Sequence, residues 1–386
     1  MGLHQVEARI SLTQLARNIE LTKARLGRVK LLFPVKADAY GHGAVAVARL
    51  AERTGLVDYL GVANLDEAVE LRQAGIELPV LIMSASRPEL AGELAAAGVT
   101  VTVSTPELAQ ALERASALRR QRTPVQIKVD SGMGRNGVLL EEAFEFIRQL
   151  QALSHLELEG VFTHFSVSYS TQPDDQEYTR GQIAGFNELL AELDRAGLLP
   201  PLRHIANSSG LIQYEPQVAA GYYNLVRPGI LLYGHPEVRR PWTEPIRPIL
   251  QMVSWIVCLK TLPAGRYIGY GRRYRTEGPR RIATLPVGYA DGLSWLLERS
   301  GEVLLHGRRA SIVGGISMDQ ITVDVSEIPE ACMGDEVELI GDQLSALELS
   351  EKIGAHFTEV ILTALSRRVV RVYSSAGKSE PSSVPC

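Results

Sequence analysis

Eight short apolar runs, spread over residues 30–230, constrain the fold of this chain more than any other feature. Each run is nearly continuous and rich in β-branched residues, as in strands that are buried on both faces. The runs are KLLFPVKA (30–37), YLGVAN (59–64), PVLIMS (79–84), VTVTVS (99–104), VQIKVD (125–130), LEGVFTHF (158–165), LRHIANSS (202–209) and YNLVRPGI (223–230).

Longer amphipathic segments separate these runs, and their periodicity predicts helices. The helices are expected over residues 43–53, 65–74, 88–97, 106–118, 141–153 and 175–196. Eight strand–helix units in about 200 residues predict an α/β fold with an N-terminal (β/α)8 barrel of the TIM type. A doubly wound open sheet shows the same alternation and is the alternative.

A second pattern begins after a proline-rich linker. The linker prolines are Pro236, Pro241, Pro245 and Pro248. Beyond them, strand-like runs alternate with glycines and helix signals are scarce, which predicts a C-terminal, mostly β domain. The expected division is a barrel over residues 1–240, a β domain over 241–373 and a disordered tail over 374–386.

Composition excludes several classes of function. The chain has 40 basic and 44 acidic residues, interspersed, so nothing predicts a nucleic-acid partner. No apolar stretch is long enough to span a membrane, and the first residues lack a signal peptide, so we expect a cytoplasmic protein. The three cysteines, Cys258, Cys332 and Cys386, have no CxxC spacing and predict neither a disulfide framework nor a metal site.

Reactive side chains fall at the ends of the predicted strands, where barrel enzymes place their active sites. Lys36 follows a buried apolar run, and burial favours the neutral amine that Schiff-base chemistry needs. Lys128 and Asp130 share one face of the fifth strand, and Arg135 lies in the glycine-containing loop beyond them. Arginine suits a carboxylate, although a purely structural Lys–Asp–Arg network fits the same pattern.

Phosphate is expected near the last two strands of the barrel, where barrels frequently bind it. Asn207, Ser208 and the turn at Gly229 and Ile230 offer hydroxyl and backbone donors. A lysine at one strand end and a phosphate site at two others suggest either a phosphorylated aldehyde cofactor or a phosphosugar aldolase.

Two further residues have weaker signals. His164 ends the sixth strand, but a lone buried histidine is more often structural, and no second histidine has metal-ligand spacing. Tyr270 lies between glycines, which allow a backbone to approach a ligand closely but also occur in ordinary turns.

Eight motifs together resemble those of one enzyme family. They are PVKADAYGHG, KVDSGMGRNG, FTHFS, HIANSSG, NLVRPGILLYG, IGYGRRY, LPVGYADG and GISMDQ. In this order and spacing they resemble the alanine racemases, which depend on pyridoxal 5'-phosphate (PLP), and the resemblance extends to about residue 373.

The resemblance implies a role for each matching residue. Lys36 would hold PLP covalently and act as one base, and Tyr270 would act as the second. The cofactor would also be held by Tyr40, Asn207, Ser208, Gly229 and Ile230 around the phosphate and by Arg227 at the pyridine nitrogen, with His164 linking Arg227 to Tyr270. Substrate carboxylate would bind Arg135 and the backbone of Met318, with Asp319 at the entrance, and Lys128 would be carbamylated.

The resemblance further implies a homodimer whose sites combine the barrel of one chain with the β domain of the other. The expected activity is the interconversion of L- and D-alanine, which serves either D-alanine supply for peptidoglycan precursors or D-alanine breakdown. One position departs from the pattern of some members, because Arg367 stands where they carry tyrosine before Arg368-Val369. A serine or broad-specificity racemase, a PLP decarboxylase and a non-catalytic PLP-binding protein are the alternatives.

Overall fold

The computed structural model describes residues 5–375 and 378–381, and these form two compact units. The barrel unit comprises residues 16–39 and 44–247. The β unit comprises the described parts of residues 1–15, 40–43 and 248–386.

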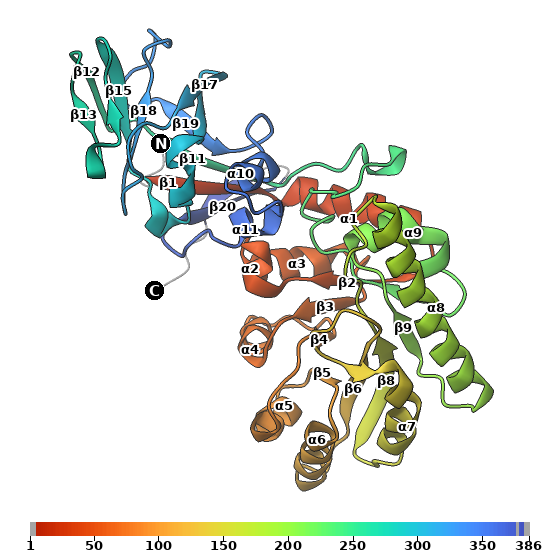
Figure 1. Ribbon diagram of the computed structural model, residues 1–386. Helices are drawn as coiled ribbons and strands as arrows, with labels where there is room; N and C mark the ends of the chain where they lie inside the picture. The colour runs from red at the N-terminus through yellow and green to blue at the C-terminus, as the bar shows by residue number, and fades with distance from the viewer. Residues whose placement is uncertain (1–4, 376–377, 382–386) are drawn as a thin grey trace. The chain divides into compact units, whose positions relative to one another are not determined.

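Eight parallel strands form the barrel unit (Figure 1). In their order around the barrel they are β10 (Leu225–Val226), β2 (Lys30–Pro34), β3 (Tyr59–Val62), β4 (Val80–Ile82), β5 (Thr100–Val103), β6 (Thr123–Asp130), β8 (Leu156–Phe162) and β9 (Leu202–His204). Backbone hydrogen bonds from Asn224 to Arg203 (3.2 Å) and from Arg227 to Ala206 (2.9 Å) link β10 to β9 and close the ring. Closure confirms the barrel and excludes the open sheet.

Helices alternate with these strands along the chain. They are α1 (Leu12–Leu26), α2 (Lys36–Tyr40), α3 (Ala44–Thr54), α4 (Leu65–Gln73), α5 (Ala91–Ala96), α6 (Pro106–Leu118), α7 (Leu140–Gln151), α8 (Pro173–Arg195) and α9 (Ser208–Val218), with short β7 (Val138–Leu139) beside β6 and a 3-10 turn at Pro88–Leu90. The start of α6 follows from sequence, since Thr105 accepts the Leu108 amide and Pro106 occupies the first turn.

Apolar side chains fill part of the barrel interior. Leu32, Leu81, Phe162 and Leu225 pack into one cluster, although they come from strands far apart along the chain. Burying a side chain of this size contributes roughly 1.5–3 kcal/mol. The apolar runs that predicted the strands therefore also supply the core that holds them.

The β unit is built around a mixed sheet. Its order is β17 (Arg308–Ser311), β16 (Glu302–Leu305), β19 (Glu336–Ile340), β11 (Leu250–Trp255), β1 (Val6–Ser11), β20 (Val370–Ser375) and β21 (Lys378–Pro381). Smaller sheets join β12 (Cys258–Leu262), β15 (Arg280–Leu285) and β18 (Ile321–Asp324), and β13 (Tyr267–Ile268) with β14 (Tyr274–Arg275). Two helices, α10 (Ala346–Lys352) and α11 (Thr358–Leu362), and 3-10 turns at Pro241–Thr243, Tyr270–Arg272, Tyr289–Asp291 and Trp295–Arg299 complete the described elements.

The first strand differs from the predicted division of the chain. We expected residues 1–240 to belong to the barrel, but β1 pairs antiparallel with β11 and parallel with β20. Val6 thus lies opposite Ser254, and Glu7 opposite Val370. The residue pattern of β1 fits a strand of the barrel as well as a strand of the β sheet. Only its pairing with β11 and β20 assigns it to the β unit.

The tail also differs where the structure describes it. Residues 378–381 form β21 and pair with β20, although we expected disorder over 374–386. Residues 376–377 and 382–386 of that expected tail lie outside the described residues. Among the helices that are described, none is long and apolar enough to cross a membrane.

Candidate active site

Lys36 begins a left-handed turn at the carboxyl end of β2. The Val35 amide still donates to the Gly61 carbonyl (2.7 Å), so Lys36 comes directly after the last strand pairing. The next four residues, Ala37–Tyr40, all have φ between 52° and 55°. Each non-glycine residue in this conformation costs roughly 1–2 kcal/mol, and such strain concentrates at functional sites.

Lys128 lies inside the barrel, close to several other cations. Its ammonium donates to Asn136 Oδ1 (2.5 Å) and lies 5.8 Å from the centre of the Phe162 ring. Burial lowers the pKa of Lys128 to about 8, and the positive charges of Arg135, Arg227 and Lys36 act in the same direction. Roughly a tenth of the amine is therefore neutral at pH 7, far more than for a lysine with the ordinary pKa near ~10.4.

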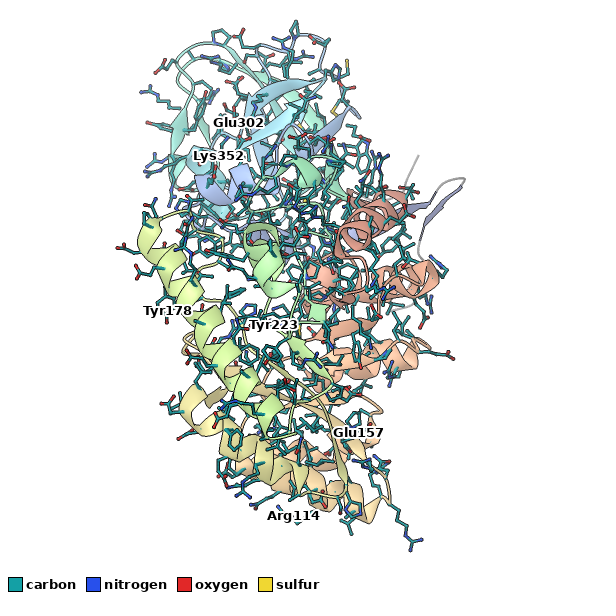
Figure 2. The ribbon with its side chains drawn as sticks, turned by 90° about the vertical axis from the view of Figure 1, so that its right-hand side faces the viewer. Arg114, Glu157, Tyr178, Tyr223, Glu302 and Lys352 are labelled. Atoms are coloured by element: carbon teal, nitrogen blue, oxygen red, sulfur yellow. The ribbon has the colours of Figure 1, made fainter. Side chains whose placement is uncertain are left out.

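The loop that carries Arg135 is fixed from both sides. Asp130 Oδ1 accepts the amides of Gly132 (2.9 Å) and Gly134 (3.0 Å), so Asp130 orders the loop instead of pairing with Lys128. From α8, the Tyr178 hydroxyl donates to the Gly132 carbonyl (2.6 Å), as its place on that helix allows (Figure 2). The exposed Arg135 guanidinium has no hydrogen-bond partner among the described residues and can receive an anion.

Arg227 is the buried cation at the centre of the barrel unit. It is 4% exposed and donates to the Thr163 carbonyl (2.8 Å), to His204 Nδ1 (2.6 Å) and to His164 Nδ1 (3.3 Å). Burial lowers the pKa of Arg227 to about 9, so the guanidinium is still charged at neutral pH. Burial, followed by the charge of Arg227, holds the pKa of both histidines well below the usual range.

A cradle of backbone donors lies where β9 and β10 end. The Leu231 amide donates to Ser208 Oγ (3.2 Å), which brings the first residue of α9 beside the turn after β10. In the described part of the chain, the buried amides of Gly229 and Ile230 have no acceptor. Asn207 caps α9 by accepting the Gly210 amide (2.9 Å). Unsatisfied backbone amides beside a helix N-terminus can bind an anion, so the donors that the predicted phosphate site needs are present, and the site itself stays a prediction.

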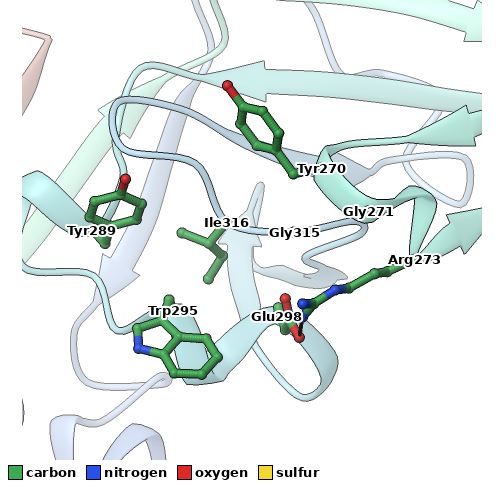
Figure 3. A pocket seen from close by; sticks show the side chains of 8 residues that line it. All are labelled: Tyr270, Gly271, Arg273, Tyr289, Trp295, Glu298, Gly315 and Ile316. Carbon is green, nitrogen blue, oxygen red and sulfur yellow. Dashed lines mark hydrogen bonds and ion pairs between the residues drawn. The ribbon is translucent and has the colours of Figure 1, made fainter.

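Tyr270 lies in the β unit, on a loop that glycine shapes. Gly269 has φ 71°, and a Cβ there would lie 2.9 Å from the Gly315 amide nitrogen. Tyr270 is 79% exposed. It borders a cavity of about 310 Å³ that is also lined by Tyr289, Trp295, Ile316 and the Arg273–Glu298 ion pair (Figure 3).

Met318 and Asp319 lie in a neighbouring loop of the same unit. The Met318 carbonyl accepts the Ala290 amide (3.1 Å), while the Met318 amide has no acceptor in the described residues and can serve a ligand. Gly288 allows this packing, since a Cβ there would lie 2.3 Å from the Met318 carbonyl oxygen. Arg368 pairs with Asp319 (2.8 Å) and with buried Asp291 (3.2 Å), which fixes the loop.

Comparison with known proteins identifies the family. The family model for the alanine racemase N-terminal domain matches residues 10–237, and the model for the alanine racemase C-terminal domain matches residues 249–373. The chain belongs to the alanine racemase family. An alanine racemase of Desulfovibrio desulfuricans is 39% identical over 371 residues, which are 95% of this chain and 98% of that protein.

Solved structures of alanine racemases have the same fold. The enzyme of Clostridium difficile superposes with a TM-score of 0.91 at 34% identity, covering 98% of each chain. The alanine racemase of Bartonella henselae, whose structure contains covalently bound pyridoxal phosphate, gives a TM-score of 0.85 at 26% identity over 96% of this chain and 99% of that one. These similarities confirm the predicted combination of a barrel with a C-terminal β domain.

The predicted site residues of this alanine racemase family member fall into two groups. The barrel unit brings together Lys36, Lys128, Arg135, His164, Asn207, Ser208, Arg227, Gly229 and Ile230. The β unit contains Tyr270, Met318 and Asp319, and it also includes Tyr40. The roles of all these residues stay predictions.

Sequence analysis missed two buried polar residues of the barrel, His204 and Gln126. His204 accepts from Arg227, which leaves its Nε2–H to donate to Gln126 Oε1 (2.7 Å). The His204 ring also stacks on Phe162 at 4.8 Å between ring centroids. The available signal was a polar side chain inside an apolar strand run, in each of VQIKVD and LRHIAN.

Proposed function

We propose that the chain interconverts L- and D-alanine, with PLP bound at the barrel end that carries Lys36. The observation that carries this proposal is the buried anion cradle of Ser208, Gly229 and Ile230 in the same unit as a lysine on a strained turn. Family membership supports the reaction, and the covalent cofactor of the Bartonella henselae relative supports PLP.

The barrel residues fit this cofactor. The Lys36 amine would hold it covalently, the cradle amides and Ser208 hydroxyl would bind its phosphate, and Tyr40 and Asn207 would complete that end. Arg227 would face the pyridine nitrogen, where its positive charge at neutral pH disfavours protonation of the ring. When bound, PLP supplies an electron sink that acidifies the substrate Cα–H bond.

Racemisation needs a proton removed from one face of Cα and one returned to the other. The Lys36 amine would serve one face and the Tyr270 hydroxyl the other. His164 accepts from Arg227 through Nδ1, so its Nε2–H points the other way and would donate to Tyr270. The buried charge of Arg227 would then stabilise the anionic form of the tyrosine through His164.

Substrate binding would use the two free donors found on the loops. The Arg135 guanidinium and the Met318 amide would hold the substrate carboxylate, with Asp319 at the entrance. Lys128 would react with carbon dioxide through its neutral amine, forming an N–C bond and releasing a proton. The resulting carbamate is anionic and would accept hydrogen bonds from Arg135, where a bare ammonium would repel it.

A homodimer would complete the site. Exposed aromatic and apolar side chains gather around Tyr270: Tyr289 is 46% exposed, Trp295 57% and Met318 51%. Such a patch is typical of a protein interface, and a second copy of the chain is the occupant we propose. Tyr270 of one protomer would act in the barrel of its partner. The cytoplasmic location stays a prediction from the sequence.

A chiral product assay tests the function. Wild-type protein with PLP is expected to convert L-alanine into a mixture of both enantiomers, and borohydride should fix the cofactor on Lys36. Lys36→Ala should lose at least ~10²–10⁴-fold in activity, since it removes a base as well as the covalent link. A reduced adduct that maps to another lysine, or a kcat/KM for serine above that for alanine, would contradict the proposal.

A further inference from the structure

The strained turn after Lys36 is held by a carboxylate from α4, the helix that follows β3 in the barrel. The Ala37 amide, which is the first backbone donor beyond Lys36, donates to Glu67 Oε1 (2.8 Å). Ala37 and Lys36 share one peptide plane. An acceptor fixed at this amide therefore fixes the plane from which the Lys36 side chain departs.

Glu67 is itself held in place by its own helix. Its second oxygen, Oε2, accepts the Ala63 amide (2.7 Å), and its backbone amide donates to Asn64 Oδ1 (2.9 Å) at the N-cap of α4. The carboxylate therefore satisfies one donor beyond β2 and one beyond β3. These strands are hydrogen-bonded neighbours, with Pro34 opposite Gly61. A side chain with two oxygens and no donor is needed to accept both amides.

A second carboxylate closes the other end of the same turn. Asp38 Oδ1 accepts the Ala44 amide (2.8 Å), the first residue of α3. The turn is thus attached at its first amide by Glu67 and at its exit by Asp38. Only the Glu67 attachment lies on the peptide of Lys36 itself, which makes Glu67 the stronger determinant of the lysine's direction.

We propose that Glu67 is a positioning residue for the racemase: it holds the Lys36 peptide in the left-handed turn and so directs the Lys36 amine. This inference rests on the proposed function, because it takes Lys36 as the lysine that binds PLP. Without the carboxylate, the Ala37 amide loses its acceptor, and the turn can relax towards the backbone conformations that non-glycine residues prefer. The amine then samples many directions instead of one.

Three variants of the full-length protein test the proposal. Glu67→Ala removes both acceptors, and Glu67→Gln keeps one acceptor but replaces the other by a donor. Asp66→Asn is the matched control, because Asp66 is exposed in the same first turn of α4 and accepts no hydrogen bond from the described residues. It removes the same charge from the same helix end and leaves the attachment intact.

Four quantities are measured: kcat, KM, the rate of borohydride-fixable PLP attachment at Lys36, and hydrogen exchange of the peptide that contains Ala37. Glu67→Ala should lower kcat roughly 10²-fold with little change in KM, as expected for a misplaced reacting group. It should also slow PLP attachment at Lys36 and accelerate exchange at Ala37. Glu67→Gln should lie between Glu67→Ala and wild type, and Asp66→Asn should match wild type.

The outcomes separate this inference from the proposed function. If wild type racemises alanine and carries PLP on Lys36, but the Glu67 variants keep its kcat and attachment rate, Glu67 does not position Lys36. Equal losses in Asp66→Asn and Glu67→Ala would overturn the inference in favour of helix-end charge. If Glu67→Ala fails to fold, Glu67→Gln is the test. A partial loss of kcat and of PLP attachment at unchanged thermal stability would support the inference, and no loss would overturn it. Wild-type protein without PLP on Lys36 would overturn both proposals.

Discussion

The barrel site around Lys36 and the β-unit loop around Tyr270 differ in how their polar groups are held. In the barrel, Arg227 is almost fully buried and makes hydrogen bonds to carbonyls and two histidines. In the loop, Tyr270 is 79% exposed, and its hydroxyl has no hydrogen-bond partner among the residues described. The barrel residues are therefore preorganised within one chain, whereas the tyrosine lacks the surroundings that a base requires. The difference supports a site completed by a second chain.

Subunit complementation is the strongest test of whether Lys36 and Tyr270 of different chains act in one site. Lys36→Ala and Tyr270→Phe should each lower activity by ~10²–10⁴-fold, because each removes a base. In a mixed dimer with shared sites, one site receives both substitutions and the other receives neither. Exchange of subunits between the two inactive variants should therefore restore up to half of wild-type activity per mixed dimer.

The exchange itself must be verified, for instance by mass spectrometry of differently tagged subunits. Sites contained within one chain would each keep one defect, and mixing would restore nothing. Proven exchange without recovered activity would contradict the shared-site proposal. It would not contradict the proposed roles of Lys36 and Tyr270.

Substitution of Lys128 tests which charge the barrel places beside Arg135. Lys128→Ala removes the group that faces Arg135, so activity should fall roughly tenfold to 10²-fold through a misplaced guanidinium. A small carboxylate such as acetate should restore part of the activity if the native group is a carbamate. A small amine should restore it instead if the native group is a bare lysine.

Isotopically labelled carbon dioxide gives a direct readout for the same residue. Wild-type protein should incorporate the label, Lys128→Ala should not, and Lys260→Ala, an exposed lysine in the β unit, should behave as wild type. Carbon dioxide reacts with the neutral amine, and the pKa of about 8 supplies that form near neutral pH. Uptake that is equal in both variants would contradict the carbamate.

The barrel, and the position of several polar residues at its strand ends, were predictable because they follow from local patterns. Eight apolar runs separated by amphipathic segments determine the strands, and the position of Lys36 or Ser208 at a strand end determines which edge it joins. Tyr270 carried only a glycine signal, so its assignment depended on resemblance to the family.

Three features could not be predicted, each for a physical reason. The left-handed turn at Ala37–Tyr40 contains no glycine, so its residue types give no sign of positive φ. The pairing of β1 depends on partners more than 200 residues away, which periodicity does not identify. The contact of His204 with Arg227 depends on which side chains meet across the barrel, and that follows from packing rather than from either strand alone.

The smallest expected effect concerns stability, and it again separates the two regions. His235 in the barrel unit is partly buried, and desolvation of its ring lowers its pKa to about 4 from an ordinary value near ~6.5. In contrast, His306 in the β unit is exposed and hydrogen-bonded to Asp335 (2.8 Å). A histidine whose pKa is depressed by folding binds its proton more readily in the unfolded chain. Its contribution is therefore intact above about pH 6.5, and stability is lost as the pH falls towards 4.

For His235 alone, linkage gives a loss of about 2 kcal/mol between pH 7 and pH 5. His235→Asn removes the titrating group, so the barrel should lose less stability over this range than in wild type, whatever the substitution costs at pH 7. His306→Asn, the control, should leave the pH dependence of the barrel unchanged. Hydrogen exchange of peptides from β9 and β10 measures the opening of the barrel separately from the β unit. An unchanged pH dependence in His235→Asn would show that His235 takes up its proton equally in the folded and unfolded chain. The acid sensitivity of the barrel would then come from other groups, among them His164 and His204, whose pKa values burial also lowers.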